Sequence, residues 1–201
     1  MIDSEFVRHA VELPGAELTL LQPAAAAELR DDGPVEWAPV APYWAVVWRS
    51  GVALARELAT QPLRGRRLIE LGCGLAVPSL VAARAGAEVV ATDRDPEALA
   101  LAERNAAENG LRIETALADW SAPEEIVGRC PFDLVLAADV LYERQSVAQL
   151  LSLLPGLAPE AWIADPGRPA AQPFLERARE RWQVETTARG VVNLHRLRLD
   201  D

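Results

Sequence analysis

The chain has 201 residues, half of them apolar, and its 20 basic residues are all arginines, set against 30 acidic residues. This length and apolar content predict one globular domain with a sizeable core. The formal net charge of −10 argues against a general nucleic-acid binder, because phosphate contacts need a cationic face, and it suits a basic peptide or protein partner better.

The sequence offers few residues suited to metal binding or redox chemistry. Cys73 and Cys130 stand apart, and His9 and His195 are isolated, so neither a zinc site nor a disulfide framework is predicted. We expect each histidine to be an ordinary surface or strand residue. No apolar run approaches the ~20 residues of a membrane span, and no basic segment followed by an apolar one precedes the domain. We therefore expect a cytoplasmic protein without a metal or a membrane anchor, and a monomer is the expected oligomeric state.

Proline and glycine break the first part of the chain into short apolar pieces. We treat residues 1–42 as an N-terminal arm of short strands or turns, with a helical turn near residues 24–29. The main domain then spans residues 43–201. Its first helix is predicted over residues 50–60, with Ser50 as a candidate N-cap.

From there onward, strand and helix patterns alternate. The predicted strands span residues 67–71, 88–92, 112–117, 133–138, 160–164, 181–187 and 191–198. The predicted helices span residues 76–85, 95–109, 145–154 and 171–181. This alternation predicts an α/β fold with a Rossmann-like, mostly parallel seven-strand sheet and helices on both faces. The last two strands meet at Arg189-Gly190, which leaves no room for a crossover helix, so they are predicted to form an antiparallel hairpin.

The first predicted strand of this sheet ends near Glu70 and leads into a tight turn with Gly72 and Gly74. The next strand is followed by Asp93. Strand, glycine turn, helix, strand and acid is the arrangement by which α/β sheets bind an adenosine-containing cofactor, because the glycines admit the ligand close to the backbone and the acid binds ribose hydroxyls. Cys73 lies within the turn, and we expect it to pack beside the cofactor rather than to act as a nucleophile.

The motif separates two classes of cofactor. A dinucleotide fingerprint needs a third glycine where this chain has Val77, and Glu70 would repel a pyrophosphate. A carboxylate at this strand end instead suits the ammonium and sulfonium charges of S-adenosylmethionine (SAM). With its E-x-G-x-G motif, the chain resembles the class I, seven-strand SAM-dependent methyltransferases. That resemblance implies SAM as the cofactor and S-adenosylhomocysteine as the product.

The third strand is followed by Asp119 and Trp120. In the family that the chain resembles, an acid at this position accepts a hydrogen bond from the adenine amino group, and its neighbour often packs on the ring. Stacking on an aromatic side chain contributes ~1–3 kcal/mol per base. The alternative is that Asp119 caps the next turn and Trp120 fills the core beneath it.

The fourth strand is a nearly continuous apolar run that ends at Ala138, which we expect to lie against the cofactor, and Asp139 and Tyr142 follow it. Enzymes of this fold that methylate amide or nucleobase nitrogens carry N/D-P-P-Y/F here, and the absence of these prolines disfavours DNA adenine and glutamine as acceptors. The D-x-x-Y motif instead resembles the subgroup that methylates lysine side chains in proteins. This resemblance implies that Asp139 orients the acceptor amine and that Tyr142 flanks its channel. The alternative is that Asp139 only caps the turn and Tyr142 lies on the rim.

Two further segments narrow the resemblance. Residues 42–55 read P-Y-W-A-V-V-W-R-S-G-V-A-L-A, and residues 165–169 read D-P-G-R-P. Both resemble segments of the electron-transfer-flavoprotein β-subunit lysine methyltransferases and their bacterial relatives. The implied partner is a protein with an exposed lysine, such as the electron-transfer flavoprotein β subunit.

Side chains in these two segments are candidate site residues. Trp48 is expected either to line the cofactor or to anchor the arm on the sheet. Tyr43 and Trp44 are expected either to line a substrate entrance or merely to pack. Because it follows a strand end, the second segment is a candidate wall of the acceptor pocket, with Asp165 or Arg168 facing the substrate.

Other functions stay open at this point. A small-molecule amine or pyridine N-methyltransferase uses the same cofactor site, and an acceptor pocket closed by residues 1–42 would favour it. A SAM-binding protein without activity is a second alternative, although the intact D-x-x-Y motif argues against it. An NAD-dependent oxidoreductase is the least favoured.

Overall fold

A hairpin begins the part of the chain that the computed structural model describes, which comprises residues 6–27, 43–142 and 144–200. Its two antiparallel strands and the helical turn after them are β1 (Phe6–Leu13), β2 (Ala16–Pro23) and α1 (Ala24–Ala27). These strands are longer than predicted, because Leu18 and Leu20 alternate toward the core and Gly15 closes the turn with a φ of +71°. Residues 28–42, which include the end of the predicted helical turn, lie outside the described residues.

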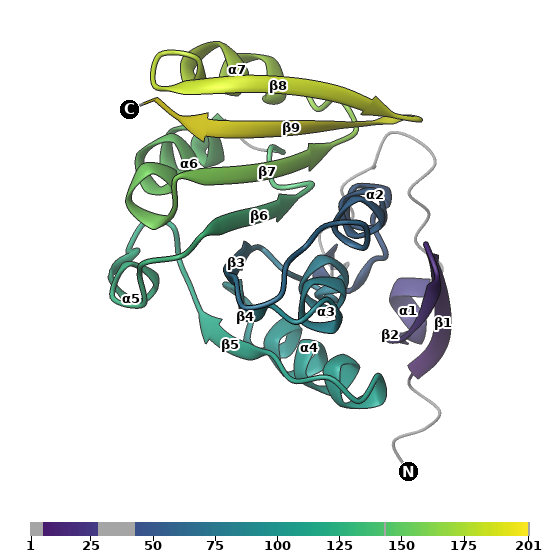
Figure 1. Ribbon diagram of the computed structural model, residues 1–201. Coiled ribbons are helices and arrows are strands. Elements are labelled where there is room, and N and C mark those ends of the chain that lie inside the picture. Colours follow the sequence, from purple (N-terminus) through teal and green to yellow (C-terminus); the bar gives the residue numbers. More distant parts are fainter. Residues whose placement is uncertain (1–5, 28–42, 143, 201) are drawn as a thin grey trace.

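The main sheet has seven strands in the order β5-β4-β3-β6-β7-β9-β8 (Figure 1). The strands are β3 (Arg67–Leu71), β4 (Glu88–Asp93), β5 (Glu114–Leu117), β6 (Leu134–Ala138), β7 (Glu160–Asp165), β8 (Trp182–Arg189) and β9 (Val192–Leu199). The first five are parallel, and β9 runs antiparallel to both β7 and β8. The predicted α/β fold with its antiparallel C-terminal hairpin is confirmed.

Helices cover the sheet on both faces. They are η1 (Tyr43–Ala45, a short 3₁₀ helix), α2 (Arg49–Leu58), α3 (Val77–Arg84), α4 (Pro96–Glu108), α5 (Glu124–Val127), α6 (Arg144–Leu157) and α7 (Ala171–Ala178). Helix α5 was not predicted, because four residues are too few to show a helical period. Helix α6 continues past Pro155, where the predicted helix ends, because Leu154 and Leu157 on its last turn pack into the core.

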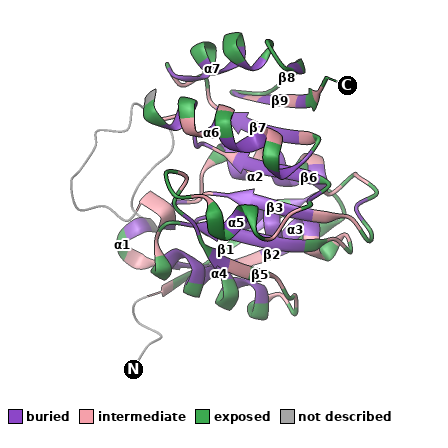
Figure 2. Ribbon diagram, turned by 90° about the vertical axis from the view of Figure 1, so that its left-hand side faces the viewer, coloured by how far each residue is buried: buried purple, intermediate pink, exposed green. Residues whose placement is uncertain are grey.

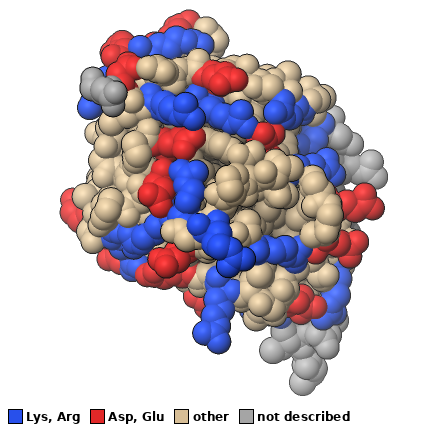
Figure 3. All heavy atoms as spheres, in the orientation of Figure 1, with Lys and Arg blue, Asp and Glu red and all other residues tan. Residues whose placement is uncertain are grey.

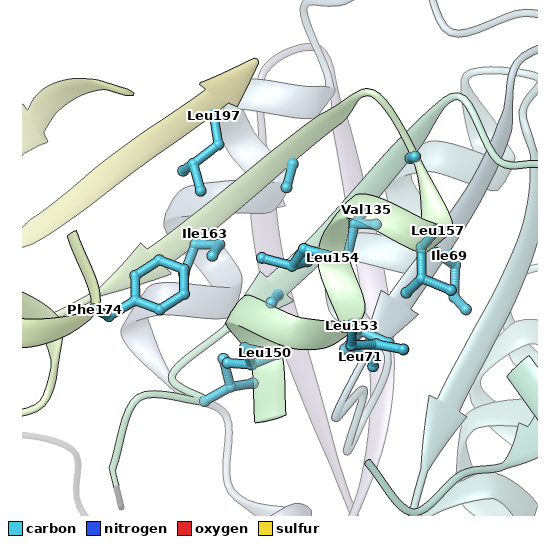
Figure 4. Close-up of a cluster of buried hydrophobic side chains, with 14 of the residues drawn as sticks. Ile69, Leu71, Val135, Leu150, Leu153, Leu154, Leu157, Ile163, Phe174 and Leu197 are labelled. Atoms are coloured by element: carbon cyan, nitrogen blue, oxygen red, sulfur yellow. The ribbon is translucent and has the colours of Figure 1, made fainter. Parts of the chain in front are cut away.

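Alternate residues of the central strands face two different cores. Along β3, Ile69 and Leu71 point to one face, into a cluster that also holds side chains of α6 and α7 such as Leu150 and Phe174 (Figure 4). Leu68 points to the other face, in a cluster that also holds apolar side chains of α2, α3, α4 and the hairpin. Figure 2 shows the buried central strands and the exposed outer surfaces of the helices. Burial on both faces explains why the parallel strands are almost wholly apolar.

Two asparagines, one on α4 and one at its C-cap, attach the hairpin to the main sheet. Asn109 Oδ1 accepts from the backbone N–H of Thr19 at 3.0 Å, and Asn109 Nδ2 donates to the Thr19 carbonyl at 2.7 Å. One helical turn earlier, buried Asn105 accepts from the N–H of Leu21 at 2.7 Å and donates to the carbonyls of Leu21 and Leu75 at 3.4 Å each. The side-chain amides thus pair with β2 as a neighbouring strand would, and Asn105 also joins the hairpin to the glycine turn.

Within the described ranges, no helix has both the length and the apolar character of a membrane span. The same residues contain no group of three or more His, Cys, Asp or Glu side chains placed to hold a metal ion.

Candidate active site

A cavity of about 550 Å³ opens at the carboxyl ends of β3, β4 and β6. The strand order reverses between β3 and β6, because β3 is followed by β4 on one side and β6 by β7 on the other, and open α/β sheets bind ligands at such a point. The volume is in the range of small-molecule sites. All the predicted site residues except Asp165 line it: Tyr43, Trp44, Trp48, Glu70, Gly72, Cys73, Gly74, Asp93, Asp119, Trp120, Ala138, Asp139, Tyr142 and Arg168.

The glycine turn on the cavity floor packs closely against neighbouring residues. Gly72 has a φ of +68°, and a Cβ atom there would lie 3.2 Å from the side chain of Val140 and 3.7 Å from the ring of Trp120. Gly74 has a φ of +49°, and its Cβ would lie 2.5 Å from the carbonyl oxygen of Trp44. Both positions therefore need glycine for conformation and for space.

Glu70, at the end of β3, is almost completely buried beneath this turn, with 1% of its surface exposed. Its Oε2 accepts from the backbone N–H of Ser79 at 2.9 Å and also from the Ser79 hydroxyl. Burial raises the pKa of Glu70 to about 8, against the lowering effect of these hydrogen bonds, and the nearby charge of Asp93 raises it further. Near neutral pH and without a cationic ligand, the neutral carboxyl is the main form.

Asp93 connects the end of β4 to the glycine turn. Its Oδ2 accepts from the N–H of Gly74 at 3.0 Å, and its Oδ1 accepts from the N–H of Asp95 at 3.1 Å. Burial raises the pKa of Asp93 above its usual value, and the backbone donors partly offset this effect. The carboxylate is therefore fixed in orientation at the cavity edge before any ligand arrives.

Cys73, between the two glycines, is buried, and its backbone N–H donates to the Thr92 carbonyl at 2.9 Å. Burial and then the charges of Glu70 and Asp93 raise the pKa of the Cys73 thiol well above its usual range. A thiol held neutral in this way is a poor nucleophile. This environment agrees with the expected packing role.

Asp119 lies exposed at the cavity edge and caps the turn after β5. Its Oδ1 accepts from the Ser121 hydroxyl at 2.7 Å and from the Ser121 N–H at 2.8 Å, and these bonds lower the pKa of Asp119. Trp120 is partly buried against the core while its ring faces the cavity beside Gly72. Asp119 thus caps a turn and Trp120 packs on the core, as the alternative interpretation expected, and both residues also line the cavity.

Asp139 stands directly after β6 in a left-handed backbone conformation, with a φ of +58°. Its side chain is 4% exposed, and Oδ1 accepts a hydrogen bond from Arg168 Nε at 2.8 Å. The Arg168 guanidinium also lies 5.8 Å from the ring centre of Trp48, whose indole N–H donates to the Tyr43 carbonyl at 3.0 Å. The segments around residues 48, 139 and 168 therefore meet on one wall of the cavity.

Asp165 does not face this cavity, and that part of the prediction is corrected. Its side chain is completely buried, and Oδ1 accepts from the N–H groups of Gly167 and Arg168 at 2.6 and 2.7 Å. Its Oδ2 lies 2.8 Å from Nε2 of His195 on β9, whose Nδ1 lies 2.9 Å from the Thr186 hydroxyl on β8. A strand end followed by Pro-Gly indicated a turn, but the sequence alone did not show that a histidine 30 residues later fills the space behind it.

Helix α6 contributes cavity residues that were not predicted. Gln145, Ser146 and Gln149 line the side next to Tyr142. Ser146 and Gln149 follow Gln145 by one and four residues, so the three side chains share one helix face. This helical spacing after the D-x-x-Y motif was the sequence signal that could have predicted them. Arg94 and Asp95, which follow β4, also line the cavity.

Comparison with known proteins connects this geometry to a family. A family model described as lysine methyltransferase matches residues 42–161, from the segment before η1 to the start of β7. The chain belongs to the lysine methyltransferase family. The matched range contains the glycine turn and the D-x-x-Y motif, so the resemblance inferred from these motifs is confirmed.

Individual relatives of this chain agree with that assignment. The electron transfer flavoprotein beta subunit lysine methyltransferase of Danio rerio is 31% identical over 173 residues, which cover 83% of this chain and 65% of that protein. Protein N-lysine methyltransferase METTL21A of Danio rerio is 34% identical over 121 residues, which cover 57% of this chain and 55% of that protein. The chain thus spans less than two thirds of the length of these relatives.

Solved structures share the fold at low sequence identity. The 16S rRNA N2 G1207 methyltransferase of T. thermophilus, in complex with AdoMet and guanosine, superimposes with a TM-score of 0.71 at 17% identity and covers 97% of this chain and 51% of that chain. The ribosomal protein L11 methylase of Lactobacillus delbrueckii subsp. bulgaricus has a TM-score of 0.61 at 19% identity and covers 76% of this chain and 79% of that chain. They support the seven-strand methyltransferase fold.

Proposed function

We propose that this chain is a SAM-dependent N-methyltransferase that transfers a methyl group to a lysine side chain of a protein and releases S-adenosylhomocysteine. The observation that carries the proposal is the position of the family's D-x-x-Y motif. Asp139 and Tyr142 line the same cavity as the glycine turn, on the wall that Arg168 completes. The cofactor and the acceptor would therefore meet in one space.

Several groups that line the cavity suit the parts of SAM. Gly72, Cys73 and Gly74 form the floor of the cavity, and Glu70 beneath it suits a cationic amino-acid group. Asp93 is oriented by two backbone N–H groups and is placed to accept from ribose hydroxyls, while Trp120 offers a flat surface for the adenine. When bound, SAM supplies an electrophilic methyl group on its sulfonium.

The remaining residues act on the acceptor amine. A lysine ammonium has an ordinary pKa of ~10.4 and must lose its proton before its nitrogen has a free lone pair. A partly dry cavity disfavours the charged form and so promotes this loss. Asp139 is placed to orient the amine through a hydrogen bond, and Tyr142 is placed to flank its path, so the contribution of the protein is mainly alignment. We assign Asp139 an orienting role and not that of an obligate base.

The acceptor that we propose is the β subunit of the electron-transfer flavoprotein. The similarity to a β-subunit lysine methyltransferase over 83% of this chain supports that choice. We place Tyr43 and Trp44 at the substrate entrance, because both line the cavity from the segment before α2. The small-molecule alternative depended on closure of the pocket by the arm, of which residues 28–42 lie outside the described residues.

We further propose a cytoplasmic monomer that does not bind nucleic acid, in which the arm of residues 1–42 and the domain of residues 43–201 act as one unit. The shared core of the hairpin and the sheet supports the last point. Arginine and acidic side chains are interspersed across the face seen in Figure 3 and do not form one continuous cationic surface. Pairs such as Arg129 with Glu125, at 2.8 Å, neutralise part of the arginine charge.

One labelling experiment tests the proposed function. The purified chain and its Asp139→Asn variant are incubated with methyl-labelled SAM and either purified electron-transfer flavoprotein or a cell extract. We expect label on a lysine of the β subunit with the wild type only. Label confined to small molecules would replace the protein acceptor by the amine alternative, and SAM binding without transfer to any fraction would make the chain a non-catalytic SAM-binding protein.

A further inference from the structure

A series of polar contacts, buried at its centre, runs from the C-terminal hairpin to the catalytic wall of the cavity. It begins at Thr186 on β8, passes through His195 on β9 to Asp165 at the end of β7, and reaches Arg168, whose Nε donates to Asp139. Each step is 2.9 Å or shorter. The C-terminal hairpin itself contributes no residue to the cavity wall.

We propose that His195, acting through Asp165, is a positioning residue that sets Arg168 against Asp139. This inference rests on the proposed methyl transfer for its effect on activity. His195 is 2% exposed and Asp165 is fully buried, so a polar pair of this kind stays in the core only when its hydrogen bonds are satisfied.

The contacts fix the orientation of the imidazole. Its Nε2 donates to Asp165 Oδ2 at 2.8 Å, because a carboxylate oxygen is an acceptor, and its Nδ1 lies 2.9 Å from the Thr186 hydroxyl. Both ring nitrogens then have a partner. Asp165 receives three donors in total, because its Oδ1 also accepts from the N–H groups of Gly167 and Arg168.

The contacts of Asp165 also determine where Arg168 lies at the cavity wall. Asp165 holds the backbone of the turn that carries Arg168, and the guanidinium then has one side near the Trp48 ring and its Nε on Asp139. Gly167 permits the turn with a φ of +85°. When the Asp165 carboxylate rotates, the N–H groups of Gly167 and Arg168 lose their acceptor. Arg168 is then no longer held at the distance that orients Asp139. Misplacement of a reacting group by about 1 Å lowers turnover by about 10²-fold.

Two substitutions of His195 separate its two contacts. His195→Gln keeps an N–H donor near the position of Nε2 and so preserves the contact with Asp165. His195→Asn places its amide near Nδ1, keeps only the contact with Thr186, and leaves Asp165 without its side-chain donor. Leu197→Ala, two residues along the same strand and fully buried, controls for a general loss of stability.

The experiment has one readout that is independent of catalysis. The Nε–H resonance of Arg168, identified by its loss in Arg168→Lys, reports the hydrogen bond to Asp139 by NMR. We expect His195→Asn to shift or broaden this resonance and to lower kcat by at least tenfold, with SAM affinity within about threefold of the wild type. His195→Gln should retain the resonance and most of the turnover, and Leu197→Ala should lower the melting temperature without moving the resonance.

The outcomes distinguish failure of this inference from failure of the proposed function. An unchanged Arg168 resonance in His195→Asn overturns the positioning role, and so does an equal change in His195→Asn and Leu197→Ala. If the wild type transfers no methyl group, the proposed function fails, but the resonance still decides whether His195 positions Arg168.

Discussion

The carbonyl oxygen of Trp44 lies only 2.5 Å from the point where a Cβ atom would stand on Gly74. This contact joins the segment before α2 to the glycine turn after β3, although 30 residues separate them in the chain. The turn therefore needs glycine for two reasons: its left-handed conformation and the approach of another stretch of backbone.

Gly74→Ala should impair cofactor binding more than the conformation alone explains. A left-handed alanine costs ~1–2 kcal/mol of stability, and the Trp44 backbone must also shift. We expect SAM affinity, measured by calorimetry, to fall at least tenfold. Gly110→Ala is the matched control, because Gly110 has a φ of +65° but nothing within 4 Å of its added Cβ. Equal losses of SAM affinity in both variants would contradict the role of the Trp44 contact.

Asp139→Asn should abolish turnover while SAM affinity stays within a few-fold of the wild type. Asparagine tolerates the left-handed backbone of this position, so the fold is expected to survive the change. Asp139→Ala should also be inactive and should be less stable by ~1–2 kcal/mol. Methyl transfer, SAM titration and thermal unfolding of both variants check these expectations. Joint loss of SAM binding and turnover in Asp139→Asn would place the residue in the cofactor site.

Glu70 should make the unliganded protein less stable as the pH rises. Its pKa in the folded state, about 8, lies above the ordinary glutamate pKa of 4.5, so folding favours the neutral carboxyl. Its contribution is fully present below pH 4.5 and is lost as the pH rises toward 8. Relative to Glu70→Gln, the wild type should therefore lose roughly a few kcal/mol of unfolding free energy across this range. Denaturant unfolding at a series of pH values measures the difference, and parallel curves for the two proteins would contradict it.

SAM binding should show the opposite pH trend at the same residue. A cationic ligand favours the ionised carboxylate, so binding near neutral pH should release a proton from Glu70. Affinity is then expected to increase as the pH rises toward 8, and Glu70→Gln should weaken SAM binding and flatten this dependence. Calorimetry in two buffers of different ionisation enthalpy counts the released protons. Equal proton release by the wild type and Glu70→Gln would show that another group is responsible.

Asn105→Ala should loosen the N-terminal hairpin and disturb the glycine turn. The buried N–H of Leu21 would lose its acceptor, at a cost of ~1–3 kcal/mol. Asn109→Ala removes a similar amide pairing at a more exposed point, so its effect should be smaller, and it leaves the contact with Leu75 intact. Hydrogen exchange at β2 and SAM affinity together test this pair. Equal loss of SAM affinity in both variants would contradict a specific effect through Leu75.

The fold could be predicted almost completely because its signals are local. The seven predicted strands of the main sheet start and end within two residues of those observed, since apolar runs ended by glycine or acid determine a parallel sheet. The hairpin was underestimated, because the burial of Leu18 and Leu20 depends on a helix far along the chain. Helix α5 has too few residues for a period to be visible.

Residues that follow strand ends were placed on the cavity correctly, since the carboxyl ends of parallel strands share one edge. Asp165 also follows a strand end, but its side chain turns inward to His195, and no local pattern reports that contact. Gln145 and Gln149 were missed because glutamine is common on exposed helix faces. Contacts between elements that are distant in the sequence therefore could not be predicted from this sequence alone.

The attachment of β2 to α4 also orders events during synthesis. Leu21 and Thr19 are made 84 and 90 residues before the asparagines that bind them. At ~5–20 residues per second, the hairpin waits on the order of ten seconds for its docking partner. Asn105 reaches Leu75 as well, so the hairpin docks and the glycine turn gains its support in the same late step. The ligand-binding floor is thus completed only once α4 has been made.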